Sequence, residues 1–503
     1  MKVGVLRKGT VMTMVNLLCC FVLLRLISLG LYPLSDTTEA RYGNIARLMV
    51  ETGNWITPQY TLGVPFWGKP PLSTWLAAGS MNLFGINEFA ARLPSLLLAL
   101  ATMGLVWFMT VRQRGVTVAT AALVVLISMP LFFVSSGAVM TDPALLLGTT
   151  LGMTGFWLAV TNRDSYGISF GYLFFLGLAV GLLAKGPVAV ILTGLPIFGW
   201  VAVTRNWAAI RSGLPWGRGL LLVAILVVPW YLLAEQRTPG FLEYFLVGEH
   251  WQRFLVPGWS GDLYGSAHVR PKGTIWWYWA VCAFPWSLIL AAVIFKKNTR
   301  KHWLGLCRAN REWYLYLLLW AMSPMLFFTL AGNILWTYVL PGLPAFAILV
   351  AEGFFGRMAS CDEAEGRSLP VNWLAGGMLA LSTLLLILVS FGYGPKASQK
   401  ELIAHYRASR TTEQDTLTYL FRRPYSAEFY SKGTADVIKD PRKAESLFDN
   451  RAVDYFAVRE GDEQLLPSSF LARTVRLGTF NSMVLRKEKS ELLTFINNHE
   501  TGT

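Results

Sequence analysis

The sequence has few charged residues and few cysteines. Only 15% of its 503 residues are Asp, Glu, Lys or Arg, whereas a soluble domain has about 25%. The five cysteines stand at positions 19, 20, 282, 307 and 361. Neither a disulfide framework nor a metal-type spacing connects them, so we interpret them as structural. The low charge excludes an ordinary soluble protein.

Long apolar runs take the place of charge. The chain is 54% hydrophobic, contains 20 Trp and has a mean hydropathy of +0.44. Runs long enough to cross the roughly 30 Å apolar core of a bilayer cover about 11–31, 89–111, 116–134, 143–161, 168–184, 187–203, 218–236, 274–295, 313–331, 334–351 and 371–391. We therefore predict a membrane protein of about eleven spans. The first run has full length and no small-residue cleavage site, which does not resemble a cleavable signal peptide.

Lys and Arg residues indicate the orientation of these spans. They recur after every second crossing, and the richest loop contains Lys296, Lys297, Arg300, Lys301, Arg308 and Arg311. With eleven spans and a cytoplasmic N-terminus, these loops lie on the cytoplasmic side. The net charge of +14 is thus mainly a topology signal, and its dispersal over loops argues against a nucleic-acid-binding patch.

The outer face then receives the loop 32–88, the turn near 135–142, the loop 237–273 and the chain after about 391. We expect a membrane domain over 1–391 and a small periplasmic α/β domain over 392–503. In the first loop, residues 41–51 and 72–84 have the pattern of interfacial helices. In the C-terminal domain we expect strands at 454–459 and 482–486, and helices at 440–450 and 488–498.

Unusual polar residues gather on that outer face. They are Asp36, Glu39, Arg41, Lys69, Asp142, Lys185, Glu249, His250, Gln252, Arg253, His268, Arg270, Lys272 and Tyr338. Ionisable groups at a membrane surface are costly to bury and indicate function. Carboxylates can accept a hydroxyl proton while cations stabilise a departing phosphate. The mixture therefore suits transfer of a group from a lipid phosphate to a hydroxyl.

Several motifs, in order along the chain, resemble one family. They are Asp36-Thr-Thr-Glu39-Ala-Arg41-Tyr42, Gly53-Asn-Trp55-Ile-Thr-Pro58, Phe66-Trp67-Gly68-Lys69-Pro70-Pro71, Asn87-Glu88-Phe-Ala-Ala-Arg92, Thr141-Asp142-Pro143, Lys185-Gly186-Pro187 and Glu249-His250-Trp251-Gln252-Arg253-Phe254. The family is that of the membrane glycosyltransferases that include lipid A aminoarabinose transferase and the bacterial relatives of protein O-mannosyltransferases. The resemblance implies a mainly α membrane protein of the GT-C fold, with a polyprenyl-phosphate sugar donor and transfer with inversion on the periplasmic side.

The resemblance also implies roles for single residues. It places Lys69 and Arg270 at the donor phosphate, and Tyr338 resembles a tyrosine that lines the lipid-phosphate pocket. Apart from the resemblance, we expect the cations Arg253 and His268 near the phosphate as well. The resemblance places the carboxylate of Asp142 in the active cavity. Other residues expected around the cavity are Arg41, Tyr42, Lys185, Glu249 and His250.

Two positions depart from the family's pattern. Thr38 stands where an Asp is usual, which leaves the catalytic base open between Asp36 and Glu39, with Asp142 as a further candidate. Gly68 stands where aminoarabinose transferases tend to have a Glu. The identity of the sugar is therefore left open.

We predict a glycosyltransferase of the bacterial inner membrane with its active site on the periplasmic face. The donor is a sugar linked to undecaprenyl phosphate, and the acceptor is lipid A, another lipopolysaccharide part or another surface glycan. No cofactor or metal is obligatory, although a divalent cation near the carboxylates stays open. The oligomeric state is not defined, and a monomer is the simplest expectation.

Three alternatives compete with this prediction. A protein O-mannosyltransferase has the same donor chemistry and a protein acceptor. A lipid or sugar transporter would carry ionisable groups near the bilayer midplane and show repeated halves, which this sequence lacks. A structural or assembly protein gives no reason for the Lys-Pro-Pro and Glu-Ala-Arg-Tyr motifs.

Overall fold

The computed structural model describes residues 2–162, 165–265, 268–355, 361–393, 397–449 and 453–489. The chain divides into two compact units. The membrane unit consists of residues 1–30 and 48–387, and the C-terminal unit consists of residues 31–47 and 388–503. The segment 31–47 of the first outer loop therefore belongs with the C-terminal unit. The predicted division near residue 391 assigned it to the membrane domain.

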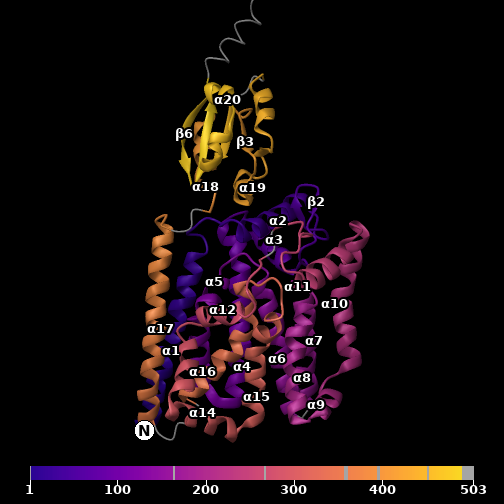
Figure 1. Ribbon diagram of the computed structural model, residues 1–503. Coiled ribbons are helices and arrows are strands. Elements are labelled where there is room, and N and C mark those ends of the chain that lie inside the picture. Colours follow the sequence, from indigo (N-terminus) through magenta and orange to yellow (C-terminus); the bar gives the residue numbers. More distant parts are fainter. Residues whose placement is uncertain are drawn as a thin grey trace, which may run out of the picture. The chain divides into compact units, whose positions relative to one another are not determined.

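Helices make up almost all of the membrane unit (Figure 1). In chain order they are α1 Lys2–Ser28, α3 Leu72–Phe84, α4 Glu88–Ile127, α5 Pro130–Ser135, α6 Asp142–Thr161, α7 Ser165–Lys185, α8 Val188–Thr204, α9 Trp207–Gly213, α10 Trp216–Arg237, the π-helix η1 Glu243–Gln252, α11 Arg253–Leu255, α12 Thr274–Cys282, α13 Ser287–Phe295, α14 Lys297–Ala309, α15 Arg311–Phe328, the 3₁₀ helix η2 Trp336–Gly342, α16 Leu343–Phe355 and α17 Cys361–Ser390. α2, Thr38–Thr52, crosses the boundary between the units.

Seven helices in the described residues are long and apolar enough to span a membrane. The protein is thus a multi-span membrane protein, and the number eleven stays a prediction. Two predicted spans, 89–111 and 116–134, fall on α4 and α5, and the backbone of Gly115 (φ 82°, ψ 176°) interrupts α4 between them. The predicted span 274–295 is divided between α12 and α13. A turn containing Pro285, which has no backbone N–H to donate, separates those two helices.

Glycines bring α6 and α7 into close contact. A Cβ on Gly148 would lie 2.7 Å from the backbone nitrogen of Gly181, and one on Gly177 would lie 2.4 Å from that of Gly152. Small residues at such spacing let two membrane helices approach backbone to backbone. This packing fixes α7 against α6, and Asp142, the first residue of α6, meets Lys185, the last residue of α7.

The first outer loop has the two helices that its pattern predicts. α3 covers the predicted residues 72–84, and α2 begins three residues before the predicted helix 41–51. Between them lies a two-stranded antiparallel hairpin of β1, Gln59–Thr61, and β2, Val64–Pro65. The hairpin leads directly into Phe66-Trp67-Gly68-Lys69.

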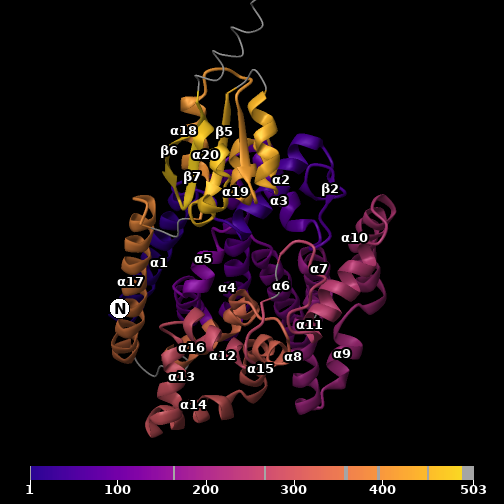
Figure 2. The ribbon, with the colours of Figure 1, turned by 45° about the horizontal axis from the view of Figure 1, so that its top comes forward.

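A five-stranded mixed sheet forms the centre of the C-terminal unit (Figure 2). Its strand order is β4-β3-β5-β7-β6, with β3 parallel to β4 and β5, and β7 antiparallel to β5 and β6. The elements are α18 Lys400–Ser409, β3 Thr416–Leu420, α19 Tyr425–Ser431, β4 Asp436–Ile438, η3 Pro441–Asp449, β5 Asp454–Arg459, η4 Glu460–Leu465, α20 Ser468–Arg473, β6 Thr474–Phe480 and β7 Met483–Glu488.

The side chains of β5 point alternately to the two faces of this sheet, and both faces are covered. Tyr455 and Ala457 pack with the residues of α18, whereas Phe456 and Val458 pack with those of η3 and α20. Successive side chains of a strand point to opposite faces. β5 coincides with the strand predicted at 454–459. The segment predicted as helix 440–450 is the 3₁₀ helix η3 over its described part, and the helix predicted at 488–498 lies mostly outside the described residues.

Candidate active site

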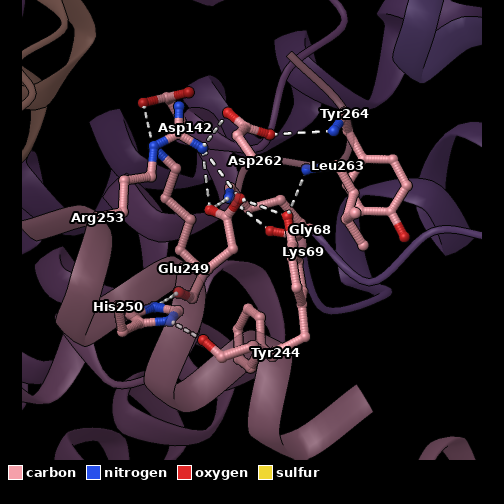
Figure 3. A network of polar contacts seen from close by, with 12 residues as sticks. Gly68, Lys69, Asp142, Tyr244, Glu249, His250, Arg253, Asp262, Leu263 and Tyr264 are labelled. Atoms are coloured by element: carbon pink, nitrogen blue, oxygen red, sulfur yellow. Dashed lines mark hydrogen bonds and ion pairs between the residues drawn. The ribbon is translucent and has the colours of Figure 1, made fainter. Parts of the chain in front are cut away.

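A network of buried charges occupies the membrane unit where η1 meets the loop after β2 (Figure 3). The Glu249 carboxylate, only 4% exposed, accepts hydrogen bonds from Lys69 Nζ at 3.0 Å and from Arg253 Nη1 at 2.9 Å. Arg253 Nη1 also lies 3.1 Å from Asp262 Oδ2. Lys69 and Arg253 remain 21% and 17% exposed. These two cations are thus held in place while part of each stays accessible.

Local structure explains how Glu249 and Arg253 reach the same point. They lie four residues apart across the end of the π-helix η1 and the start of α11. Residues at this spacing share a helix face, and π-helical turns are rare and occur frequently at functional sites. Lys69 is directed from the other side by the loop that ends at Pro70-Pro71, where each proline ring restricts the backbone.

Aromatic side chains of residues 237–273 hold the loop that carries Lys69 against η1. Tyr264 donates its hydroxyl proton to Pro65 O and accepts the N–H of Trp67 at 3.0 Å. Tyr244 donates to Glu249 Oε1 at 3.4 Å. A Cβ on Gly68 would lie 2.9 Å from the ring of Phe66. The tight packing gives a physical reason for glycine at position 68, and Glu249 supplies the carboxylate beside Lys69 instead.

A second ion pair joins Asp142 and Lys185, with Lys185 Nζ 2.7 Å from Asp142 Oδ1. The two side chains are 11% and 10% exposed. Pro143 suits the first turn of α6, and the carboxylate of Asp142, the first residue of that helix, is bound by Lys185. Gly186, with φ 78°, turns the chain directly after Lys185. A Cβ there would lie 2.6 Å from the Phe245 ring, so only glycine fits between α7 and η1.

His250 and Tyr338 connect the two groups of charges. One ring nitrogen of His250 lies 2.7 Å from Phe245 O and the other lies 2.9 Å from Lys185 O. The Tyr338 ring lies 5.3 Å from Lys185 Nζ. The electrostatic influence of Tyr338 also reaches Arg253, whose pKa it helps to raise. The six charged groups, Lys69, Arg253, Lys185, Glu249, Asp262 and Asp142, therefore form one neighbourhood with balanced charge.

Burial and charge act in opposite directions on these groups. Burial alone would raise the pKa of Glu249, but the charges of Lys69 and Arg253 outweigh it and the pKa is lowered. For Arg253, burial is outweighed by Glu249, and its pKa is raised. Burial lowers the pKa of the His250 imidazole, which its hydrogen bond to Phe245 only partly offsets. Glu249 is therefore an anion at neutral pH, and its two partners are cations.

The remaining predicted phosphate ligands lie on an exposed strand-like segment. Val269 pairs with Asn333 as a β-bridge, and Ile334 N–H donates to His268 O at 3.0 Å. The Asn333 side-chain amide donates to Arg253 O at 2.6 Å and to Val256 O at 3.0 Å. Asn333 thus joins the segment that carries His268 and Arg270 to the turn after Arg253. Arg270 is exposed, and within the described residues it has no ion-pair partner.

The first motif lies in the C-terminal unit. Both oxygens of Asp36 accept hydrogen bonds from Ser426, and Glu39 Oε2 accepts the N–H of Ser35 at 3.3 Å. The Arg41 guanidinium lies 5.2 Å from the Tyr42 ring centroid and 5.9 Å from that of Tyr425. The catalytic roles predicted for these residues stay predictions.

Sequence reasoning missed Asp262, Tyr244, Tyr264 and Asn333. Asp262 and the two tyrosines stand in the same outer loop as Arg253, so a search for counter-charges within that loop could have found the carboxylate. Nothing local marks Asn333, since its partners lie about 80 residues away. No group of three or more His, Cys, Asp or Glu suited to a metal occurs in the residues searched, which are those described. The expected absence of an obligatory metal stays a prediction.

The fold and this network of charges define a multi-span membrane protein with the GT-C fold. Residues 10–245 match the family model of dolichyl-phosphate-mannose-protein mannosyltransferases. Over 95% of its length the chain resembles the crystal structure of ArnT from Cupriavidus metallidurans bound to undecaprenyl phosphate, with a TM-score of 0.78, 20% identity and 98% of that chain covered. The archaeal oligosaccharyltransferase AglB from Archaeoglobus fulgidus shares the fold more distantly, at a TM-score of 0.52, 13% identity, and 90% and 70% coverage.

Curated relatives agree with the structural similarity. The chain is 31% identical over 385 residues to an undecaprenyl phosphate-alpha-4-amino-4-deoxy-L-arabinose arabinosyl transferase from Edwardsiella ictaluri, covering 74% of this chain and 64% of the relative. It is 30% identical over 386 residues to the protein of the same name from an Enterobacter species, covering 75% and 65%. The chain spans just under two thirds of these relatives' length. By fold and sequence the chain resembles these ArnT proteins.

Proposed function

We propose that this protein transfers a sugar from undecaprenyl phosphate to a periplasmic acceptor, lipid A or another surface glycan, with inversion at the anomeric carbon. The names of the relatives and the bound undecaprenyl phosphate in the ArnT crystal structure support this donor. The observation that carries the proposal is the pair Lys69 and Arg253. Both cations are held by the buried Glu249 and both keep an accessible part.

In the transfer step, the bond between the anomeric carbon and the phosphate oxygen breaks, and its electron pair stays on the phosphate. Negative charge therefore grows on the departing lipid phosphate. Preorganised cations in a water-poor site stabilise such charge strongly. Lys69 and Arg253 take this role, with Arg270 and His268 contributing from the adjoining segment. Glu249 and Asp262 hold Arg253 in position.

The acceptor oxygen attacks the anomeric carbon from the opposite side, which gives inversion. Where the acceptor is a hydroxyl, its proton goes to a carboxylate, and we assign this role to Glu39, because Glu39-Ala-Arg41-Tyr42 is the part of the first motif that agrees with the family's pattern. Asp142 remains the second candidate. Where the acceptor is a phosphate, it is already ionised and no base is required.

The proposed location is the bacterial inner membrane, with the site on the periplasmic face. Its support is the distribution of Lys and Arg over alternate loops, of which α14 carries an exposed basic run. Arg41, Tyr42 and Tyr338 are proposed to line the sugar and lipid-phosphate region. A monomer is the proposed working state.

A second candidate function is transfer of mannose from a polyprenyl phosphate to a protein hydroxyl. The match of residues 10–245 to the protein mannosyltransferase family model favours it. The donor chemistry is the same, and only the sugar and the acceptor differ. One assay with separate donor and acceptor arms can therefore distinguish the two functions.

The test uses full-length protein in lipid nanodiscs. Undecaprenyl phosphate-linked aminoarabinose with lipid A, and undecaprenyl phosphate-linked mannose with a Ser/Thr-rich peptide, form the two arms. Mass spectrometry measures free undecaprenyl phosphate and the modified acceptor. We expect release in the first arm, and a loss of about 100- to 1,000-fold in kcat/KM for Lys69→Ala, because removing one preorganised donor costs this much.

Lys297→Ala is the matched control, since Lys297 is an exposed lysine on α14. Release that survives Lys69→Ala unchanged would refute the assignment of the phosphate site. Release in the mannose arm alone would favour the second function. In a parallel assay with sealed proteoliposomes, movement of the intact lipid-linked sugar across the bilayer without release would instead identify a transporter.

A further inference from the structure

The segment that begins the first motif is attached to α19 of the C-terminal unit. Asp36 Oδ1 accepts the N–H of Ser426 at 2.9 Å, and Asp36 Oδ2 accepts the Ser426 hydroxyl. The Asp36 N–H donates to Ala397 O at 2.7 Å. Burial raises the pKa of Asp36 even though the hydrogen bonds from Ser426 act to lower it. Asp36 thus uses both carboxylate oxygens and its backbone within the fold.

Neighbouring residues of the segment make further contacts with the same helix. The Leu34 N–H donates to the Tyr430 hydroxyl at 2.7 Å. A Cβ on Gly43 would lie 3.7 Å from the Phe429 ring, so α2 passes close to α19 there. Arg41 lies over the ring of Tyr425. Four residues between Leu34 and Gly43 are therefore placed by residues 425–430.

We propose that Asp36 and Ser426 form a clamp, defined by these two side chains, that orients the start of α2 and so positions Glu39 and Arg41. α2 begins at Thr38, two residues after Asp36. Because a helix is rigid over its first turns, fixing the residue before it fixes the direction of the side chains that follow. Asp36 is then a positioning residue, and the C-terminal unit takes part in transfer by ordering the motif.

This inference rests on the proposed function, because the value of the clamp lies in the role of Glu39. It also separates two roles for Asp36. A catalytic base needs an ionisable carboxylate, and Asp36→Asn abolishes its function. A clamp needs hydrogen-bonding groups of the same shape, and the Asn amide offers one oxygen to accept and one nitrogen to donate. The Ser426 hydroxyl can both donate and accept, so it fits either partner.

The experiment compares Asp36→Ala, Asp36→Asn, Ser426→Ala and the double variant Asp36→Ala/Ser426→Ala, with Ser446→Ala as control. Ser446 is an exposed serine of the same unit, on η3. For Asp36→Ala and Ser426→Ala we expect kcat to fall about 10- to 100-fold, because small displacements of reacting groups cost this much. The KM for the donor should change less than kcat, because Lys69 and Arg253 are unchanged and only Arg41 is displaced together with Glu39.

The double variant should lose no more than the worse single variant, as expected for two groups that act as one unit. Asp36→Asn should keep kcat within about three-fold of the wild type, because the Asn amide can accept the Ser426 N–H and donate to the Ser426 hydroxyl, so both contacts are kept. Hydrogen exchange of the amides at 38–47 should accelerate in Asp36→Ala and Ser426→Ala, and should stay at the wild-type rate in Asp36→Asn and Ser446→Ala.

Two results would overturn the clamp. Asp36→Asn as inactive as Asp36→Ala, with unchanged exchange, identifies Asp36 as the base. Wild-type exchange and kcat in Ser426→Ala show that α19 does not order the motif. If Ser426→Ala fails to fold, the contrast between Asp36→Asn and Asp36→Ala decides alone. If the wild type transfers no sugar, the proposed function fails, and the exchange rates still decide whether the clamp exists.

Discussion

Two buried glutamates of the membrane unit, Glu249 and Glu352, resemble each other and have different surroundings. The Glu352 carboxylate is fully buried and accepts hydrogen bonds from Arg114 Nε at 2.6 Å, Trp313 Nε1 at 2.8 Å and the Tyr314 hydroxyl at 2.6 Å. Glu249 is 4% exposed and binds two cations, Lys69 and Arg253. Each carboxylate is thus buried and satisfied.

The two carboxylates differ in the number of cations that surround them. Glu352 has one cation, Arg114, whose side chain is 21% exposed, and two neutral donors, Trp313 and Tyr314, whose side chains are buried. At Glu249 both partners are cations, one of them is shared with Asp262, and both keep accessible surface. A buried carboxylate by itself indicates only a satisfied core group. Two cations that are held by one carboxylate and both keep accessible surface indicate a site for an anion, whereas the single cation of the Glu352 cluster is a paired core group.

Breaking the Glu352 cluster should give the largest effect on stability. Glu352→Ala leaves Arg114 without its carboxylate and should lower the free energy of unfolding by about 3–5 kcal/mol, as when one partner of a buried ion pair is removed. Thermal unfolding in detergent measures this loss. Glu312→Ala, at an exposed glutamate at the start of α15, is the control. If folded Glu352→Ala protein showed a weaker donor affinity, the distinction between the clusters would not hold.

A conservative change at the Glu249 cluster should affect activity with little effect on stability. Arg253→Lys keeps the charge, but the ammonium group ends a shorter side chain and does not reach the position of Arg253 Nη1, which contacts both Glu249 and Asp262. We expect kcat/KM for the donor to fall about 10- to 100-fold, measured by release of undecaprenyl phosphate. The exposed Arg308→Lys on α14 should match the wild type. An unaffected Arg253→Lys would mean that Lys69 and Arg270 suffice.

The smallest expected effect is a pH dependence of stability at Glu249. Its pKa in the folded protein is lower than the ordinary value of 4.5. The ionised pair therefore stabilises the fold fully above that ordinary value, and the contribution is lost as the pH falls through the lower folded pKa. The midpoint temperature of thermal unfolding should fall more steeply below about pH 4.5 for the wild type than for Glu249→Gln. Parallel curves would contradict the assigned direction.

Much of the membrane unit could be predicted from the sequence. The apolar runs that became α6, α7, α8, α10 and α15 are local features, and their ends agree with the helices within a few residues. The interruption of α4 at Gly115 and the division of 274–295 into two helices could not be predicted from hydropathy. Hydropathy is averaged over a window of residues and does not depend on the backbone angles of one residue. The loop helices α2 and α3 were predictable from their periodicity.

The site was predictable only as a set of residue types on one face. Lys69, Asp142, Lys185, Glu249, His250, Arg253 and Tyr338 were chosen from motifs, and the structure brings them into one neighbourhood. The first motif predicts Asp36 as a candidate base, and in the structure its carboxylate is bound by Ser426, 390 residues away. Sequence spacing carries no information about such a partner.

By itself, the sequence determined the membrane class, most of the long apolar helices and the order of the motifs, because each depends on local composition. Only the tertiary structure decided which charges meet. Lys69 and Glu249 are 180 residues apart, and Lys185 reaches Asp142 through the packing of glycines between α6 and α7. Ion pairing acts over a few ångströms, and the folded chain alone sets those distances.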